Sequence, residues 1–175
     1  DKEIEVIHNF VDVQRFHKKP VDAFRKLISP NGEKIIVHAS NFRKLKRVED
    51  VVATFLLIQE KMPATLLLLG DGPERTHLEA SARKCESPNT IKFLGKQAQM
   101  EDILPIADLF LLTSEYESFG LAALEAMAAS VPVISTNAGG LPEINVHGFS
   151  GYMSNVGDVE DMSKNALLIL KDNAT

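Results

Sequence analysis

Short apolar runs alternate along the chain with longer amphipathic segments, and polar turns separate the two. Continuous apolar runs of this kind predict strands that are buried on both faces, as in a parallel sheet. Such runs occupy residues 34–39, 65–69, 90–94, 107–112 and 133–136. Helical segments lie between them, so the order βαβαβαβαβ predicts an α/β fold with a Rossmann-like, doubly wound parallel sheet.

Apolar periodicity and capping residues predict some of the helices more clearly than others. In the segment 48–62, apolar residues gather on one side of a helix. Asp158 is a suitable N-cap for a last helix at 158–170. Shorter helices are expected at 21–28 and 100–105, a short strand at 4–7, and a loop at 147–152.

Composition narrows the function classes. The 175 residues suffice for one domain with a full core, and the net charge of −5 argues against bulk nucleic-acid binding. A single cysteine, Cys85, allows no internal disulfide and suits a reducing compartment, so we expect a cytoplasmic protein. No apolar run approaches the roughly 20 residues of a membrane span, so no transmembrane segment is expected.

The segment from 107 to 136 carries the candidate chemistry. Glu117 lies where a helix is expected to begin, and Glu125 follows eight residues later, about two turns inside that helix. Helical side chains tilt toward the N-terminus, so Glu125 is expected to lean toward Glu117. Between them, Ser118, Phe119, Gly120 and Leu121 offer free N–H groups at the positive end of a helix dipole, which suits a diphosphate.

Two carboxylates beside an anion site fit a nucleotide sugar. Sugar and ribose hydroxyls donate to carboxylates, while phosphate oxygens accept from backbone amides. The pair Glu117 and Glu125 alone is not specific, because exposed helical Glu residues at this spacing are common. Paired carboxylates also occur in glycoside hydrolases, where they flank an anomeric carbon roughly 5 to 10 Å apart.

A basic loop follows the strand at 34–39. Four of the five residues from 43 to 47 are cationic, and loops at the carboxyl edge of a parallel sheet commonly bind phosphate. A solvated basic turn is the alternative. Gly70-x-Gly72 also follows a strand, but Arg75 occupies the third glycine position, so the dinucleotide fingerprint fails and a tight turn is expected instead.

Several separate motifs together resemble one family. Glu117-x7-Glu125, with Phe119-Gly120 after the first Glu and 126–128 after the second, resembles the signature of the retaining glycosyltransferases of family 4, which have the GT-B fold. Residues 137–143 add to that resemblance. Residues 8–12 resemble the linker between the two halves of such enzymes, with Phe10 where Gly is usual.

The resemblance implies a domain organisation. Residues 1–30 would be an interdomain linker segment and 31–175 the nucleotide-sugar-binding domain, with the N-terminal acceptor domain absent. The active site of a GT-B enzyme lies between two domains, so this fragment is expected to be inactive alone.

The resemblance also implies roles for individual residues. Arg43 and Lys46 would neutralise the diphosphate, although they are three residues apart instead of five or six, Arg47 replaces the usual Gly, and Lys44 competes for the role. No metal or other cofactor is implied. Glu117 would hold sugar hydroxyls, Glu125 the ribose, and the other substrate-binding residues would be Asn41, Leu94, Gly95, Lys96, Ser118, Phe119, Gly120 and Leu121.

A narrower resemblance concerns the substrates. Residues 9–12 and 40–52 are similar to those of a bacterial subgroup of the family that transfers N-acetylglucosamine from UDP-N-acetylglucosamine to L-malate in bacillithiol biosynthesis. The small-molecule acceptor would be bound mainly by the other domain. Two other classes stay open, a UDP-sugar epimerase of related fold and a non-catalytic nucleotide-sugar-binding module; the oligomeric state, including a homo-oligomer, is also open.

Overall fold

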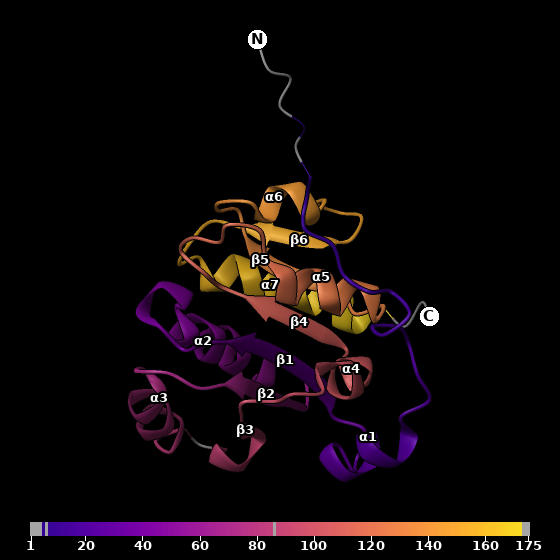
Figure 1. Cartoon of the computed structure of the whole chain (residues 1–175). Helices are drawn as coiled ribbons and strands as arrows, with labels where there is room; N and C mark the ends of the chain where they lie inside the picture. Colours follow the sequence, from indigo (N-terminus) through magenta and orange to yellow (C-terminus); the bar gives the residue numbers. More distant parts are fainter. Residues whose placement is uncertain (1–4, 6, 86, 173–175) are drawn as a thin grey trace.

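The computed structural model describes residues 5, 7–85 and 87–172. Its centre is a six-stranded sheet in which every neighbouring pair of strands is parallel. The order across the sheet is β3-β2-β1-β4-β5-β6 (Figure 1). The strands are β1 Lys34–Ser40, β2 Ala64–Gly70, β3 Ile91–Gly95, β4 Leu109–Leu112, β5 Val133–Thr136 and β6 Gly151–Ser154.

All five strands predicted from apolar runs are present, and the doubly wound parallel sheet is confirmed. The loop expected at 147–152 is wrong in part, because β6 begins at Gly151 and pairs with β5 at the edge of the sheet. A Cβ at Gly151 would lie 1.8 Å from the carbonyl oxygen of Val133, so only glycine permits this pairing. Glycine carries no strand signal, which hides the strand in the sequence.

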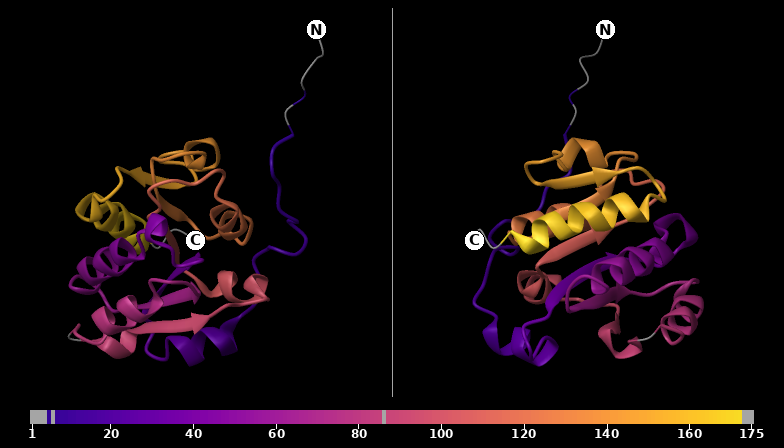
Figure 2. Two further views of the ribbon diagram at one scale, coloured as in Figure 1. Left: turned by 60° about the vertical axis from the view of Figure 1, so that its left-hand side comes forward. Right: turned by 180° about the vertical axis from the view of Figure 1, so that it is seen from behind.

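Helices cover both faces of the sheet, and each face has its own apolar core. One core lies beneath α2, α3 and α7, of which α2 and α7 run side by side (Figure 2). The other lies beneath α1, α4, α5 and α6. The bounds are α1 Asp22–Ile28, α2 Val48–Gln59, α3 Arg75–Ala82, α4 Met100–Ile103, α5 Leu121–Ala128, α6 Leu141–Ile144 and α7 Val159–Lys171, with short 3-10 helices η1 Lys44–Lys46, η2 Pro88–Thr90 and η3 Leu104–Ile106.

The helix predictions hold with shifted ends. α2 ends at Gln59, three residues before the expected end at 62. The last helix is capped as expected, since the Asp158 carboxylate accepts a hydrogen bond of 3.0 Å from the N–H of Asp161. The strand expected at 4–7 falls partly outside the described residues, and Glu5 and Ile7 belong to no strand.

The N-terminal segment lies against the domain. Phe16 is buried in the core beneath α5, and Phe24 of α1 packs on the same core. Arg15 pairs with Glu101 at 2.9 Å, and Lys19 with Asp102 at 3.0 Å, which ties this segment to α4. Residues before 31 therefore contribute packing to the α/β domain, in addition to any role as a linker.

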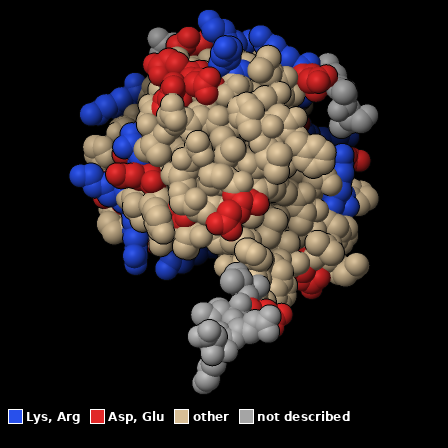
Figure 3. Space-filling view, turned by 90° about the horizontal axis from the view of Figure 1, so that it is seen from above, with Lys and Arg blue, Asp and Glu red and all other residues tan. Residues whose placement is uncertain are grey.

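The outer surface shows no transmembrane feature. Among the described residues, no helix combines the length and the apolar character needed to cross a membrane. Seen from above the β6 edge, much of the surface is uncharged (Figure 3). Charged side chains lie mainly toward its margin, and one acidic group lies nearer the middle. Val146 and Phe149, in and after the turn that follows α6, are exposed apolar side chains.

The strand order reverses at β1 and β4, which lie next to each other although they are far apart in the chain. Loops diverge there at the carboxyl ends of the strands, and ligands of doubly wound sheets bind in the resulting crevice. The glycine turn after β2 supports this edge. A Cβ at Gly70 would lie 1.8 Å from the Ser40 carbonyl oxygen, and one at Gly72 would lie 2.0 Å from that of Asn41. These glycines permit close backbone packing, as predicted.

The close packing at this turn predicts that two glycine variants differ in their free energy of unfolding. Gly32 and Gly70 both have positive φ, of 82° and 126°, but a Cβ at Gly32 would have nothing within 4 Å. Gly32→Ala should therefore cost about 1 kcal/mol from backbone strain alone. Gly70→Ala adds an overlap with Ser40 and should cost about 3 kcal/mol. Urea denaturation of both variants measures this, and equal costs would contradict the packing role.

Candidate functional site

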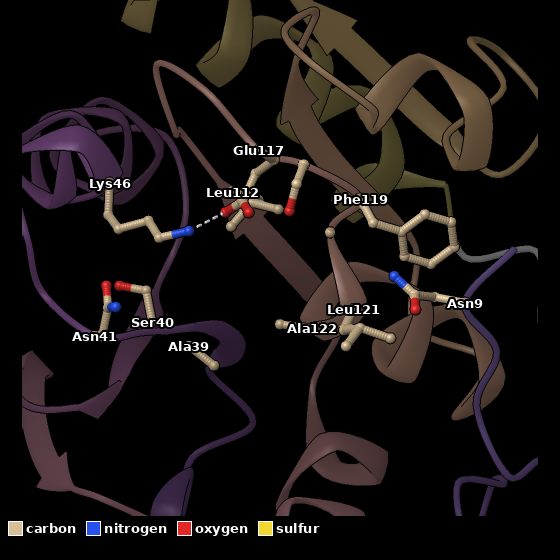
Figure 4. A pocket seen from close by; sticks show the side chains of 12 residues that line it. Asn9, Ala39, Ser40, Asn41, Lys46, Leu112, Glu117, Phe119, Leu121 and Ala122 are labelled. Carbon is tan, nitrogen blue, oxygen red and sulfur yellow. Dashed lines mark hydrogen bonds and ion pairs between the residues drawn. The ribbon is translucent and has the colours of Figure 1, made fainter.

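A pocket of about 310 Å³ lies at the carboxyl edge of the sheet, between β1 and β4. The end of β1, the basic loop after it, the loop after β4 and the first turn of α5 form its walls (Figure 4). Its lining residues are Asn9, Ala39, Ser40, Asn41, Lys46, Leu112, Glu117, Ser118, Phe119, Gly120, Leu121 and Ala122.

Lys46 and Glu117 form an ion pair within this pocket. The ammonium of Lys46 lies 2.5 Å from Oε1 of Glu117, and the two side chains are only 18% and 13% exposed. Ser114 donates a second hydrogen bond of 2.9 Å to the same oxygen. The pair connects the loop after β1 with the loop after β4, and each charge offsets the other.

Backbone contacts hold the basic loop in place. The hydroxyl of Thr113 donates to the carbonyl oxygens of Lys46 and Arg47, at 3.1 and 2.8 Å, and the N–H of Glu115 donates to Leu45. Arg47 has a left-handed backbone with φ of 46°, which explains why glycine would suit this position, and its guanidinium pairs with Asp50 at 2.6 Å. The residues after β4 therefore position Lys46.

The turn into α5 presents unused amide groups. Among the described residues, no hydrogen-bond acceptor pairs with the backbone N–H groups of residues 118–122. Gly120, with φ of 95°, precedes the first turn of α5. The neighbouring glycines support the turn, because Gly140 donates to the Glu117 carbonyl at 2.8 Å and a Cβ at Gly139 would lie 1.9 Å from that oxygen. Backbone amides at a helix N-terminus are donors of the kind that bind anions.

His38 lies beneath the pocket and is fully buried on β1. One ring nitrogen bonds the Leu111 carbonyl, and the other bonds the hydroxyl of Ser40, both at 2.8 Å. Burial lowers the pKa of His38 from 6.5 to about 4 and outweighs the hydrogen bond to Leu111, which raises it; the positive charge of Lys46 lowers it further. The ring is therefore neutral near pH 7.

The structure brings together about half of the predicted site residues. Lys46 and Glu117 line the pocket with Asn41 and residues 118–121. Five predicted residues are not among its lining residues, namely Arg43, Leu94, Gly95, Lys96 and Glu125. Arg43 is exposed and precedes η1, Leu94 and Gly95 end β3, and Lys96 follows them. Lys44, the competitor of Lys46, is exposed at the start of η1.

Glu125 is also outside the pocket lining. It lies partly buried on α5, and burial raises the pKa of its carboxyl while the positive charge of Arg15 opposes this effect. Its electrostatic neighbours are thus Arg15 and Glu101. That Glu125 leans toward the same mouth as Glu117 stays a prediction.

Sequence reasoning missed two polar residues of the pocket. Asn9 comes from the N-terminal segment and lines the pocket on the same side as Phe119 (Figure 4). Its signal was present in the 8–12 motif, which was interpreted only as a linker. Ser40 directly precedes the basic loop, but a single serine at a strand end carries no signal of its own. Among the described residues, no group of three or more His, Cys, Asp or Glu side chains is placed to hold a metal ion.

One known protein family matches most of the chain. Residues 22–175 match the family described as glycosyl transferases group 1. The match covers most of the chain, so this protein belongs to that family.

Curated relatives narrow the resemblance. The chain is 43% identical over 173 residues to N-acetyl-alpha-D-glucosaminyl L-malate synthase of Bacillus anthracis, covering 98% of this chain and 45% of that protein. It is 31% identical to the glycogen synthase of Mycobacterium tuberculosis strain H37Rv, covering 98% of this chain and 41% of that protein. The chain therefore spans less than half the length of these relatives.

Solved structures share the fold. The Anabaena protein Alr3699/HepE in complex with UDP-glucose superposes with a TM-score of 0.87 at 25% identity, covering 96% of this chain and 48% of that one. The C-terminal domain of a group 1 family glycosyl transferase, LpcC from Francisella tularensis, has a TM-score of 0.81 at 24% identity and covers 93% and 89%.

The buried His38 predicts a pH-dependent stability. The unfolded chain binds a proton near pH 6.5, whereas the folded chain binds it only near pH 4. The stabilisation is therefore complete above pH 6.5 and is lost as the pH falls toward 4. Between pH 7 and pH 5, this group should lower the free energy of unfolding by about 2 kcal/mol.

Urea denaturation at pH 7 and pH 5 measures the effect. The decrease should be about 2 kcal/mol smaller in His38→Gln than in the wild type. His77 is exposed, so His77→Gln should keep the wild-type decrease. An unchanged decrease in His38→Gln would contradict a neutral, buried His38.

Proposed function

We propose that this chain is the donor-binding domain of a retaining glycosyltransferase that transfers N-acetylglucosamine from UDP-N-acetylglucosamine to the hydroxyl of L-malate. The observation that carries the proposal is the Lys46–Glu117 pair beside the free amides of 118–122. Cationic and amide donors suit a diphosphate, and a carboxylate suits sugar hydroxyls. Its 43% identity to the N-acetyl-alpha-D-glucosaminyl L-malate synthase of Bacillus anthracis supports the choice of sugar and acceptor.

Donor binding would exchange the partners of the ion pair. The diphosphate would take Lys46 and the amides of 118–122, which leaves the Glu117 carboxylate free to accept from hydroxyls of the sugar. Ser114 already donates to Glu117 and would hold the carboxylate in place during this exchange. Lys46 would then stabilise the negative charge that grows on the diphosphate as the glycosidic bond breaks.

The other predicted residues would act around this centre. Arg43 is on the same basic loop and would approach the diphosphate from its exposed side. Glu125 would hold the ribose, and Leu94, Gly95 and Lys96 would present backbone to the base. The acceptor would bind mainly to a second domain, so residues 1–175 alone should bind the donor without transferring the sugar.

The proposal is tested by an assay on the full-length protein. UDP release and sugar transfer are measured with UDP-N-acetylglucosamine and L-malate, beside UDP-glucose and beside no acceptor. Net transfer to L-malate supports the proposal. Isomerisation of the sugar without transfer would indicate an epimerase, and donor binding without either reaction would indicate a binding module.

Lysine variants test the basic loop. Lys46→Ala in the full-length enzyme should lower kcat about a hundredfold, which corresponds to about 3 kcal/mol for a charged contact in a partly dry site. Lys44 is an exposed lysine two residues away, so Lys44→Ala is the matched control and should stay near wild type. Arg43→Ala should resemble Lys46→Ala if it touches the diphosphate. A crippled Lys44→Ala beside a normal Lys46→Ala would contradict the assignment.

Glu125→Ala should have a different kinetic signature. Ribose contacts are similar in the ground state and the transition state, so their loss should raise KM for the donor and leave kcat nearly unchanged. Steady-state kinetics with folding checked by circular dichroism measures this. A fall in kcat at constant KM would place Glu125 in the chemical step.

Chelation tests whether the reaction needs a metal ion. We propose that it does not, because Lys46 and the amides of 118–122 would supply the positive potential at the diphosphate. EDTA should leave kcat/KM of the full-length enzyme nearly unchanged. Loss of activity that Mg²⁺ or Mn²⁺ restores would contradict this part of the proposal.

A further inference from the structure

His38 takes no part in the proposed donor contacts, yet it lies directly behind a residue that lines the pocket. Its ring is fully buried on β1 and uses both nitrogens, one toward Leu111 on the neighbouring strand and one toward Ser40. Ser40 separates it from the pocket. A buried imidazole with two short hydrogen bonds is an oriented group, so the position of its proton has consequences for Ser40.

The partners determine which ring nitrogen carries the proton. The Leu111 carbonyl only accepts, so Nδ1 of His38, at 2.8 Å, must be the donor. Burial keeps the ring neutral, so Nε2 carries no proton and accepts. The hydroxyl of Ser40, 2.8 Å away, then donates its only proton to Nε2.

This arrangement determines which further hydrogen bonds the Ser40 hydroxyl can make. Its oxygen has two lone pairs, and the N–H of Phe42 uses one of them at 3.3 Å. One lone pair is left on a side chain that lines the pocket. Lys46 is already bound to Glu117, so it does not occupy that lone pair in the unliganded protein.

We infer that His38 is a positioning residue that makes Ser40 an acceptor-only contact, which selects a ligand hydroxyl or N–H and disfavours a phosphate oxygen. This inference rests on the proposed function for the identity of the ligand. Phosphate oxygens would be held by Lys46 and the amides of 118–122, and the neighbouring sugar or acceptor would donate a hydrogen bond to Ser40. The two kinds of contact would fix the direction in which the nucleotide sugar lies in the pocket.

The first experiment removes the hydrogen-bond acceptor, which is the hydroxyl of Ser40. Calorimetry on the full-length protein compares UDP with UDP-N-acetylglucosamine for wild type and Ser40→Ala, and kinetics give KM for L-malate. We expect UDP binding to be unchanged. If a hydroxyl or N–H of the sugar donates to Ser40, the affinity for UDP-N-acetylglucosamine falls about tenfold in Ser40→Ala. If the hydroxyl of L-malate donates to Ser40, KM for L-malate rises about tenfold instead.

A matched control and the contrary results complete this experiment. Ser163 is buried on α7 and bonds only the Glu160 carbonyl, so Ser163→Ala should change neither affinity nor KM. Equal weakening of UDP and UDP-N-acetylglucosamine in Ser40→Ala would show a phosphate contact and overturn the inference. No change in any of the three quantities would overturn it as well.

The second experiment tests whether His38 acts through Ser40. His38→Gln should reproduce the loss seen in Ser40→Ala, and the double variant should be no worse than either single variant. Additive losses would contradict a shared role. If His38→Gln does not fold, a nitrogen-15 spectrum of the wild-type imidazole decides, with Nδ1 protonated and Nε2 bare expected at pH 7.

The same spectrum separates this inference from the proposed function. If the wild-type protein binds no UDP, the proposed function fails, whereas the tautomer of His38 can still be measured. A spectrum with Nε2 protonated, or with both nitrogens protonated at pH 7, would overturn the inference. If Nε2 of His38 is still without a proton in Ser40→Ala, the result would confirm that the hydrogen bond to Leu111 fixes the tautomer.

Discussion

The contact between Lys46 and Glu117 joins the two loops that form the site, at the point where the order of the strands reverses. Thr113 and Glu115 fix the backbone around Lys46, while Ser114 and Gly140 fix Glu117. The polar residues after β4 therefore organise both halves of the pocket, and the parallel sheet matters for function because it brings these distant segments together.

A compensated pair of charges is a suitable resting state for an anion site. An unpaired lysine or carboxylate in a partly buried pocket would be costly, and the pair avoids this cost until a ligand supplies new partners. Binding a diphosphate alone would free Glu117 without satisfying it, whereas a nucleotide sugar satisfies both groups. His38 and Ser40 would orient the ligand in the pocket. Ser40 offers a hydrogen-bond acceptor, whereas Lys46 and the amides offer hydrogen-bond donors.

The sequence predicted the parts of this structure that depend on apolar runs and on helix caps. Five strands and the Asp158 cap were found because burial and local hydrogen bonds leave clear patterns. β6 was missed because its pairing depends on Gly151, and the surroundings of Glu125 because Arg15 is more than 100 residues away in the chain. The pocket role of Ser40 could not be predicted either, since it depends on the fold and not on a local pattern.

The measurement that tests the central claim most directly is a map of backbone amide chemical shifts in residues 1–175 as UDP is added. Binding at the Lys46–Glu117 site predicts the largest changes at residues 118–122 and in the loop from Ser40 to Arg47. In Lys46→Ala the same changes should require a higher concentration of UDP, whereas Lys44→Ala should match the wild type. Changes gathered instead around the larger hollow of about 1170 Å³, which is lined by Lys18, Arg25 and Lys34 among others, would contradict the account.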